Sequence, residues 1–97
     1  MVFKDGSRYI GDLYSEQLHG KGRFIWKNGS EYEGDWKYNK MKGVGVYKSN
    51  EGKQYIGHYV NDKKDGYGEF TWPDGKQYKG KWKKGKQHGE GEMYFLY

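Results

Sequence analysis

Hydrophobic and polar positions alternate along this chain with a period of two, and the alternation recurs at a fixed interval. In residues 32–36 the aromatic and glycine positions share one parity, while the charged positions share the other. A period of two predicts β-strands, and no segment shows the i, i+3, i+4 spacing of a helix. We therefore predict an all-β chain of eight or nine short antiparallel strands.

The same short pattern occurs four times. Its first tyrosine stands at residues 9, 32, 55 and 78, so each copy begins 23 residues after the last. Pairs of glycines keep the same step, with no insertion or deletion. A fixed period of this size indicates a repeat array rather than an ordinary globular domain. With two strands per unit, the array is predicted to consist of stacked β-hairpins.

The period divides residues 1–97 into a single array. Residues 1–8 read as the end of a preceding repeat, three full repeats occupy 9–31, 32–54 and 55–77, and 78–97 form a truncated repeat. Both ends fall within a repeat, whereas repeat arrays normally end in atypical capping units. We therefore expect the array or its parent protein to be longer.

Two kinds of connection alternate between the strands. Asn28-Gly29 and Asp74-Gly75 place a residue that tolerates positive φ before a glycine, which predicts a tight turn. The other connection, for example residues 83–88, is polar and varies between copies. It is expected to be longer.

Glycine occupies the middle of every predicted strand, on the aromatic face. Glycine weakens a strand, but an aromatic ring on a neighbouring strand can cover the space that it leaves. We expect the rings of one hairpin to cover the glycines of the next and so to replace a conventional core. The structural glycines of the repeat are Gly11, Gly34, Gly57, Gly80, Gly22, Gly45, Gly68 and Gly91.

Composition supports a folded, soluble chain. A mean hydropathy of -1.30 would be typical of disorder, but 20% of the residues are aromatic and they recur at fixed positions. The chain has no cysteine, which excludes a disulfide scaffold and a thiolate metal site and favours a reducing compartment. No apolar run approaches the roughly 18 residues of a spanning helix, and the start is no signal peptide. We expect a cytoplasmic protein.

No motif predicts an active site, a metal site or a cofactor. His19 and His88 share a repeat position and lack convergent partners, so they are expected to be turn residues. Gly20-Lys21-Gly22 lacks the second half of a phosphate-binding loop and is a feature of the repeat. We predict a protein that is not an enzyme.

The net charge of +5 permits an anionic partner. Lysines gather in the variable connections, which stack along one edge of such an array. They could bind an anionic membrane, or they could serve solubility and keep exposed strand edges apart. The candidate lipid-binding residues are Lys37, Lys40, Lys42, Lys83, Lys84 and Lys86.

The aromatic face is the predicted site for protein partners, because a groove of rings can take up an extended peptide or a helix. Nucleic acid is disfavoured, since the rings are needed to cover glycines and arginine is almost absent. Strand edges at the ends also allow end-to-end pairing or a homodimer. The candidate partner-binding residues are Tyr32, Trp36, Tyr55, Tyr59, Tyr78 and Trp82.

The recurring Tyr-x-Gly-x-Trp, followed by Gly-x-Gly-x-aromatic and Asp-Gly on a 23-residue step, resembles the MORN repeat (membrane occupation and recognition nexus). The match is best at residues 78–91, and it covers essentially the whole chain. Leu13 and Tyr59 depart from the tryptophan of the family pattern, and Ser49 replaces an aromatic residue and is expected to leave a thinner patch. The resemblance implies an elongated, twisted, single-layer antiparallel sheet of stacked β-hairpins.

MORN repeats occur in ciliary radial-spoke heads, junctional membrane proteins, plant phosphatidylinositol phosphate kinases, cytoskeletal scaffolds and a histone methyltransferase. In these settings the repeats act as scaffold or docking surface, and enzymatic activity lies in other domains. The resemblance therefore implies a non-enzymatic scaffold that binds other proteins of a larger cytoskeletal or ciliary assembly. The alternative is a phospholipid-binding, membrane-tethering module that uses the lysine-rich edge.

Overall fold

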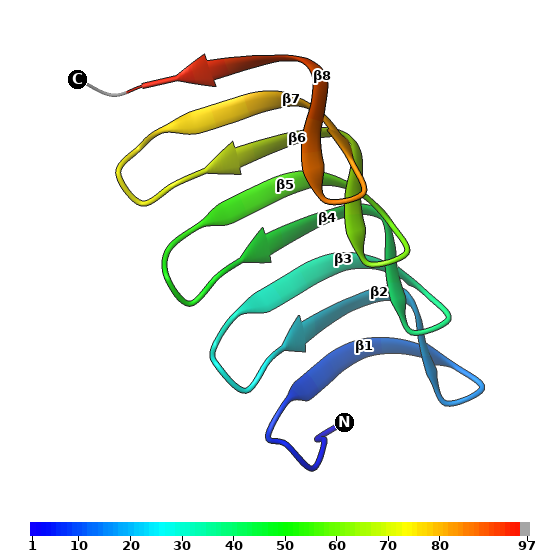
Figure 1. Cartoon of the computed structure of the whole chain (residues 1–97). Helices are drawn as coiled ribbons and strands as arrows, with labels where there is room; N and C mark the ends of the chain where they lie inside the picture. Colours follow the sequence, from blue (N-terminus) through cyan, green and yellow to red (C-terminus); the bar gives the residue numbers. More distant parts are fainter. Residues whose placement is uncertain (96–97) are drawn as a thin grey trace.

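One antiparallel sheet of eight strands makes up the fold of residues 1–95 (Figure 1). The computed structural model describes residues 1–95, and the end of the predicted truncated repeat, Leu96 and Tyr97, lies outside the described residues. Each strand pairs with its neighbours in sequence, as the all-β prediction of stacked hairpins requires. The chain measures 45 × 24 × 16 Å along its principal axes. The strands are β1 (Arg8–Tyr14), β2 (Gln17–Ile25), β3 (Glu31–Lys37), β4 (Lys40–Lys48), β5 (Gln54–Val60), β6 (Lys63–Thr71), β7 (Gln77–Lys83) and β8 (Lys86–Tyr94).

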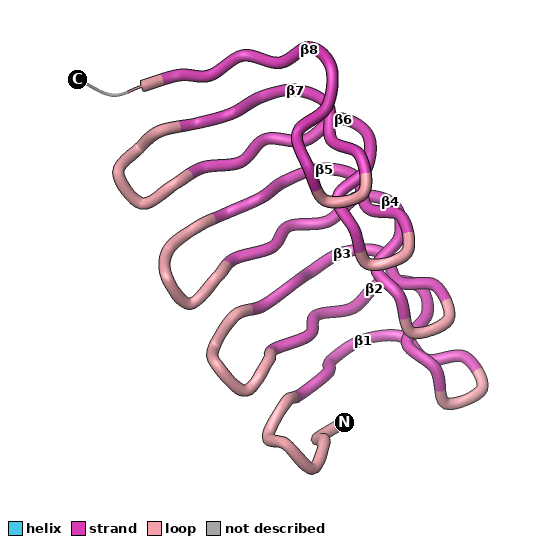
Figure 2. The backbone as a smooth tube through the Cα atoms, in the orientation of Figure 1, coloured by secondary structure: helices cyan, strands magenta, loops and turns pink. Residues whose placement is uncertain are grey.

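Every hairpin is bent near its middle, so the sheet forms a trough with two walls (Figure 2). In the second repeat Gly34 pairs with Gly45 but Trp36 pairs with Met41, so β4 carries two more residues than β3 across this bulge. Gly43 lies among those residues with a φ of 93°. A bulge bends its strand, and glycine accepts the left-handed conformation that the bend needs. The same register shift recurs in all four hairpins.

The two walls end in different connections. We call the wall that ends in residues 26–30, 49–53 and 72–76 the loop arm. The wall that ends in the two-residue turns at 15–16, 38–39, 61–62 and 84–85 is the turn arm.

The predicted lengths of the two connections were wrong, because they are reversed. Tyr38 and Asn39 have φ values of 47° and 68°, so the variable connection is a tight two-residue turn with both φ values positive. Asn28-Gly29 instead lies within a five-residue loop, in which only Gly29 has positive φ. The Asn28 side chain accepts a hydrogen bond from Ser30 N–H at 2.9 Å, which stabilises this wider loop.

Tyrosine rings cover the strand glycines, as predicted, but within their own hairpin. A Cβ added at Gly45 would overlap the Tyr32 ring of the paired strand, and one added at Gly34 would lie 2.5 Å from Gly45 Cα. The prediction that rings cover the glycines of the next hairpin was therefore wrong. Neighbouring hairpins pair through their backbones, and tryptophan adds a side-chain contact between them, since Trp36 Nε1–H donates to Gly22 O at 3.1 Å. Trp82 makes the same bond to Gly68 O at 3.3 Å.

The core is a ladder of rings along the inside of the trough. Tyr32 lies edge-to-face with Trp36 at 5.2 Å and with Tyr59 of the next repeat at 5.2 Å between ring centroids. Such pairs stabilise a fold beyond the area that they bury. Among residues 1–95 there is no helix long and apolar enough to cross a membrane. The buried side chains of the core are Tyr9, Leu18, Tyr32, Trp36, Tyr55, Tyr59, Tyr78 and Trp82.

Candidate partner-binding groove

Two adjoining hollows lie on the inner side of the trough. The first, of about 500 Å³, has a lining that includes Phe3, Leu18, Phe24, Trp26, Trp36 and Met41. The second, of about 400 Å³, has a lining that includes Trp26, Met41, Tyr47, Tyr59, Lys63 and Lys64. We call them the first hollow and the central hollow, and together they form the groove. Both draw residues from the loop arm and the turn arm, so the bend of the sheet creates the groove.

The six predicted partner-binding residues lie beneath the groove, in the core. Their exposed fractions run from 0% at Tyr32 and Tyr55 to 7% at Trp36 and Trp82. Tyr59 and Trp36 still contribute to the lining of the hollows. The other four are not among the side chains that line either hollow.

The walls of the groove are made by residues that the sequence analysis did not select. They are partly buried side chains packed against the core: Phe24, Trp26, Met41 and Tyr47. A signal for three of them was present, because the second strand of each repeat continues Gly-x-Gly-x-aromatic with the same parity. That parity predicted the second strand, but the predicted partner-binding residues were taken from the first strand of each repeat alone.

A row of rings along the loop arm is interrupted in the second repeat. Phe3, Trp26, Ser49 and Trp72 occupy the same repeat position. Trp26 packs against Phe24 at 4.9 Å and against Tyr47 of the next repeat at 5.8 Å. Ser49 has no ring, and its hydroxyl accepts hydrogen bonds from its own loop. The wall of the groove is therefore lower next to Tyr47, on the side of the central hollow.

Lys64 brings a positive charge into this aromatic setting. Its Nζ lies 5.3, 5.6 and 5.6 Å from the ring centroids of Tyr55, Phe70 and Trp82. Burial lowers the pKa of the Lys64 amine. The repeats before it place the apolar residues Leu18 and Met41 at the same position, and the fourth repeat places the neutral Gln87 there, so Lys64 is the one cation of this row.

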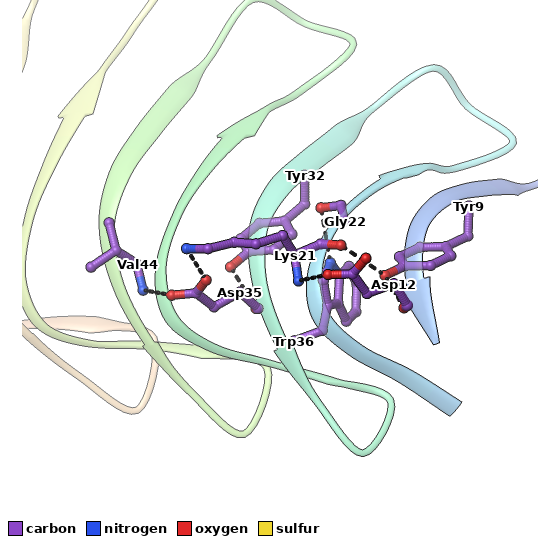
Figure 3. A network of polar contacts seen from close by, with 8 residues as sticks. All are labelled: Tyr9, Asp12, Lys21, Gly22, Tyr32, Asp35, Trp36 and Val44. Carbon is purple, nitrogen blue, oxygen red and sulfur yellow. Dashed lines mark hydrogen bonds and ion pairs between the residues drawn. The ribbon is translucent and has the colours of Figure 1, made fainter. Parts of the chain in front are cut away.

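Hydrogen bonds at the bend fix the angle between the two arms (Figure 3). Tyr32 Oη–H donates to Asp35 O at 3.0 Å, and Val44 N–H donates to the Asp35 carboxylate at 3.3 Å. An ion pair joins the Asp35 carboxylate to Lys21 of the preceding repeat. Asp12 makes the same carboxylate contact with Lys21 N–H at 3.2 Å. Backbone and side chain together therefore hold the width of the groove in the first two repeats.

The six candidate lipid-binding lysines are all exposed, at the turn-arm end of the sheet. Five of the six belong to strands rather than to the connection in which we expected them, and only Lys84 lies in a turn. Lys37 pairs with Lys40, and Lys83 pairs with Lys86. Like charges placed opposite one another destabilise a sheet. Within residues 1–95 none of the six forms an ion pair.

The histidines are strand residues, so their assignment to turns was wrong. His19 lies in β2 and His88 in β8. The His19 ring lies 5.5 Å from the Tyr14 ring and 4.9 Å from the Tyr38 ring, and its Nδ1 accepts a hydrogen bond from Tyr38 N–H at 3.4 Å. In the part of the chain that the structure describes, no three His, Cys, Asp or Glu side chains are grouped as metal ligands.

Stacked hairpins joined through tyrosine, glycine and tryptophan define a β-repeat array with a grooved inner face. The family model of the MORN repeat matches four consecutive segments, residues 9–31, 32–54, 55–77 and 78–95. The chain therefore belongs to the MORN-repeat family, whose repeats generally mediate contacts with proteins or membranes. A search of curated protein sequences found no match.

Proposed function

We propose that this chain is a non-enzymatic docking module that holds a segment of a partner protein in the groove. The observation that carries the proposal is the pair of hollows, of about 500 and 400 Å³, walled by aromatic rings and Met41. Concave, mostly apolar sites with a few polar groups are typical of peptide and ligand binding. In this proposal the six predicted core rings support the floor of the groove, and Trp26 and Tyr47 present the contact surface.

Selection of peptides from a random 16-residue display library tests this proposal. Peptides enriched on the immobilised protein are expected to bind Trp26→Ser at least about tenfold more weakly, because that change removes a wall of both hollows. Serine is the residue that the chain itself carries at the equivalent Ser49. Val44→Ser is the matched control, since Val44 is half exposed on a strand position that lines neither hollow. Equal loss on both variants, or no enriched peptide, would contradict docking in the groove.

A second candidate function is tethering to an anionic membrane through the lysines of the turn arm. The opposed pairs Lys37–Lys40 and Lys83–Lys86 favour it, because an anion between two like charges relieves their repulsion. Co-sedimentation with liposomes, with and without phosphoinositides, over a salt series tests this candidate. Pelleting that weakens with salt and is lost when Lys83, Lys84 and Lys86 become Glu would support it. An absence of pelleting at low salt would dismiss it.

We further propose that the assembly in which this module works is cytoskeletal or ciliary. The support is analogy with other proteins that carry MORN repeats. A fluorescently tagged chain expressed in ciliated cells is expected to remain with the axoneme or cytoskeleton after detergent extraction. Complete release into the soluble fraction would contradict this location.

A further inference from the structure

Lys64 is the one member of its repeat row that carries a charge into the groove. The row consists of Leu18, Met41, Lys64 and Gln87, and the last three pair across their hairpins with the core residues Trp36, Tyr59 and Trp82. Met41 and Lys64 both line the central hollow. Lys64 therefore takes the place of an apolar side chain in the lining of the hollow, and its ammonium group lies over the rings of Tyr55, Phe70 and Trp82.

The rings around the ammonium group do not neutralise it. Tyr55, Phe70 and Trp82 attract a cation with the faces of their rings, but they carry no net charge. Lys64 forms no ion pair with any residue from 1 to 95. Burial removes part of the water around the Lys64 amine and so lowers its pKa.

The other charges that line the central hollow leave an excess of positive charge. Lys63 adds a second cation, and Asp62 is the single carboxylate of the lining. The Asp62 carboxylate is held by Met41 N–H, which donates to it at 2.8 Å across the interface between two repeats. The hollow thus has two lysines against one aspartate that is already engaged.

We infer that the central hollow is a binding site for an Asp or Glu side chain of the partner segment, with Lys64 as the residue that selects the carboxylate. This inference rests on the proposed docking function and deepens it. A carboxylate at the mouth of the ring cage forms the ion pair that Lys64 lacks within the chain, and burial from water strengthens that pair.

The first hollow adds a requirement for an apolar residue in the partner segment. Its lining contains the rings of Phe3, Phe24 and Trp36 beside the carboxylates of Glu16 and Asp62, so it accepts a bulky apolar side chain and offers no lysine to an acidic one. The hollows are one repeat apart, and two strands span about 9.6 Å. Residues i and i+7 of a helix are separated by about 10.5 Å along its axis. A helical segment with a bulky apolar residue and an acidic residue seven positions apart therefore fits the groove.

The same peptide library selected in parallel on three proteins tests this inference. They are the wild type, Lys64→Met and Lys83→Met. Methionine is the residue that the preceding repeat carries as Met41, so the fold should accept it. Lys83→Met makes the same change in net charge at an exposed lysine outside the groove. Lys64→Gln, which copies Gln87, replaces Lys64→Met if that variant does not fold.

We expect Asp or Glu to be enriched at a fixed distance from a bulky apolar residue on the wild type and on Lys83→Met, and not on Lys64→Met. A wild-type-selected peptide should lose at least about tenfold in affinity for Lys64→Met. Replacing its acidic residue by the amide should weaken binding to the wild type by the same factor and leave binding to Lys64→Met unchanged.

Acidic enrichment that persists on Lys64→Met would overturn the assignment of Lys64. So would an amide substitution that weakens binding to both proteins equally. Pelleting with anionic vesicles that is lost only in Lys64→Met would assign Lys64 to a membrane instead, which also overturns the inference. No enriched peptide on any of the proteins is a different failure, because it removes the docking function itself.

Discussion

The bends of the first two repeats and those of the last two share a backbone but differ in one side chain. At Asp12 and Asp35 a carboxylate accepts a hydrogen bond from the backbone of the bulge. His58 and Lys81 occupy the same position in the third and fourth repeats, and within residues 1–95 neither side chain makes this bond. All four bends nevertheless show the same register shift.

The residues that form the bend can therefore be distinguished from the carboxylate that stabilises it in two repeats. Tyr32 and Tyr55 donate to the backbone of their bends alike, to Asp35 O at 3.0 Å and His58 O at 3.1 Å. Both rings also cover a glycine of the paired strand. The glycine and the tyrosine therefore create the trough, and the carboxylate of the first two repeats adds to its stability.

The largest expected effect on the free energy of unfolding comes from the packing of a tyrosine ring over a glycine, which all four repeats share. Gly45→Ala and Gly68→Ala should each lower the free energy of unfolding by about 3 kcal/mol, because the added methyl group overlaps the buried ring of Tyr32 or Tyr55. Gly89→Ala is the control, since no atom lies within 4 Å of its added Cβ. Its positive φ of 68° should cost only about 1 kcal/mol. Urea unfolding measures all three, and a Gly45→Ala loss no larger than that of the control would contradict ring-over-glycine packing.

Alkaline pH should also act on both halves. Burial, followed by the charge of Asp65, raises the pKa of Tyr55 to about 12, and burial raises the pKa of Tyr32. Unfolded tyrosine titrates near pH 10, so the unfolded chain loses its proton first as pH rises. The contribution of Tyr55 is complete below about pH 10, and about 2 kcal/mol of it should be lost by pH 12, after allowance for screening by solvent.

Unfolding experiments at pH 8 to 12 measure this dependence. Tyr55→Phe should flatten the curve, because phenylalanine keeps the ring and has no proton to lose. A wild-type curve that is no steeper than that of Tyr55→Phe would show that Tyr55 does not titrate as its burial implies.

The carboxylate should produce a smaller effect that distinguishes the halves. Asp35→Ala should lower the free energy of unfolding by about 1 to 2 kcal/mol, because it removes the bond from Val44 N–H and the ion pair with Lys21. His58→Ala, at the same position of the third repeat, should cost less than about 0.5 kcal/mol. Amide hydrogen exchange should accelerate at Val44 in the first variant. An equal loss of unfolding free energy in the two variants would contradict a stabilising role of the carboxylate in the first two repeats.

The smallest effect should come from supplying the missing carboxylate. His58→Asp places an acceptor opposite Tyr67 N–H, the equivalent of Val44 N–H, and should stabilise the chain by about 0.5 to 1 kcal/mol. His58→Asn provides the control, with a neutral acceptor and a weaker bond. Slower exchange of the Tyr67 amide in His58→Asp is the direct measurement. A destabilised variant would show that the third bend differs in more than its side chain.

The sheet could be predicted from the sequence because its cause is local and periodic. Tyr32 and Gly45 recur in every copy, and a ring needs a residue without Cβ beneath it. The connections could not be assigned, since Tyr38 and Asn39 adopt positive φ without the glycine that usually marks such a turn. Whether a ring covers a glycine of its own hairpin or of the next hairpin depends on the strand register. The bulge at Gly43 shifts that register by two residues.

The groove was harder to predict than the sheet. Residues of the aromatic parity supply both its floor and its walls, and alternation alone does not say which rings keep exposed area. Trp26 keeps exposed area because its ring packs against Tyr47 of the next repeat rather than into the core. Lys64 could not be assigned to the groove because a lysine in a charged stretch is usually a surface residue, whereas its long aliphatic chain lets it take the position that Leu18 and Met41 hold in the preceding repeats.

The central claim, that partners dock in the groove, is tested most directly at Ser49. By repeat equivalence with Trp26, the side chain of Ser49→Trp should lie against Tyr47 and Phe70 and close the central hollow from the loop arm. The measurement is the affinity of a library-selected peptide for this variant, with the melting temperature as a check on folding. We predict at least about tenfold weaker binding by a protein that is as stable as the wild type or more so. Unchanged affinity in a folded variant would contradict docking in the groove.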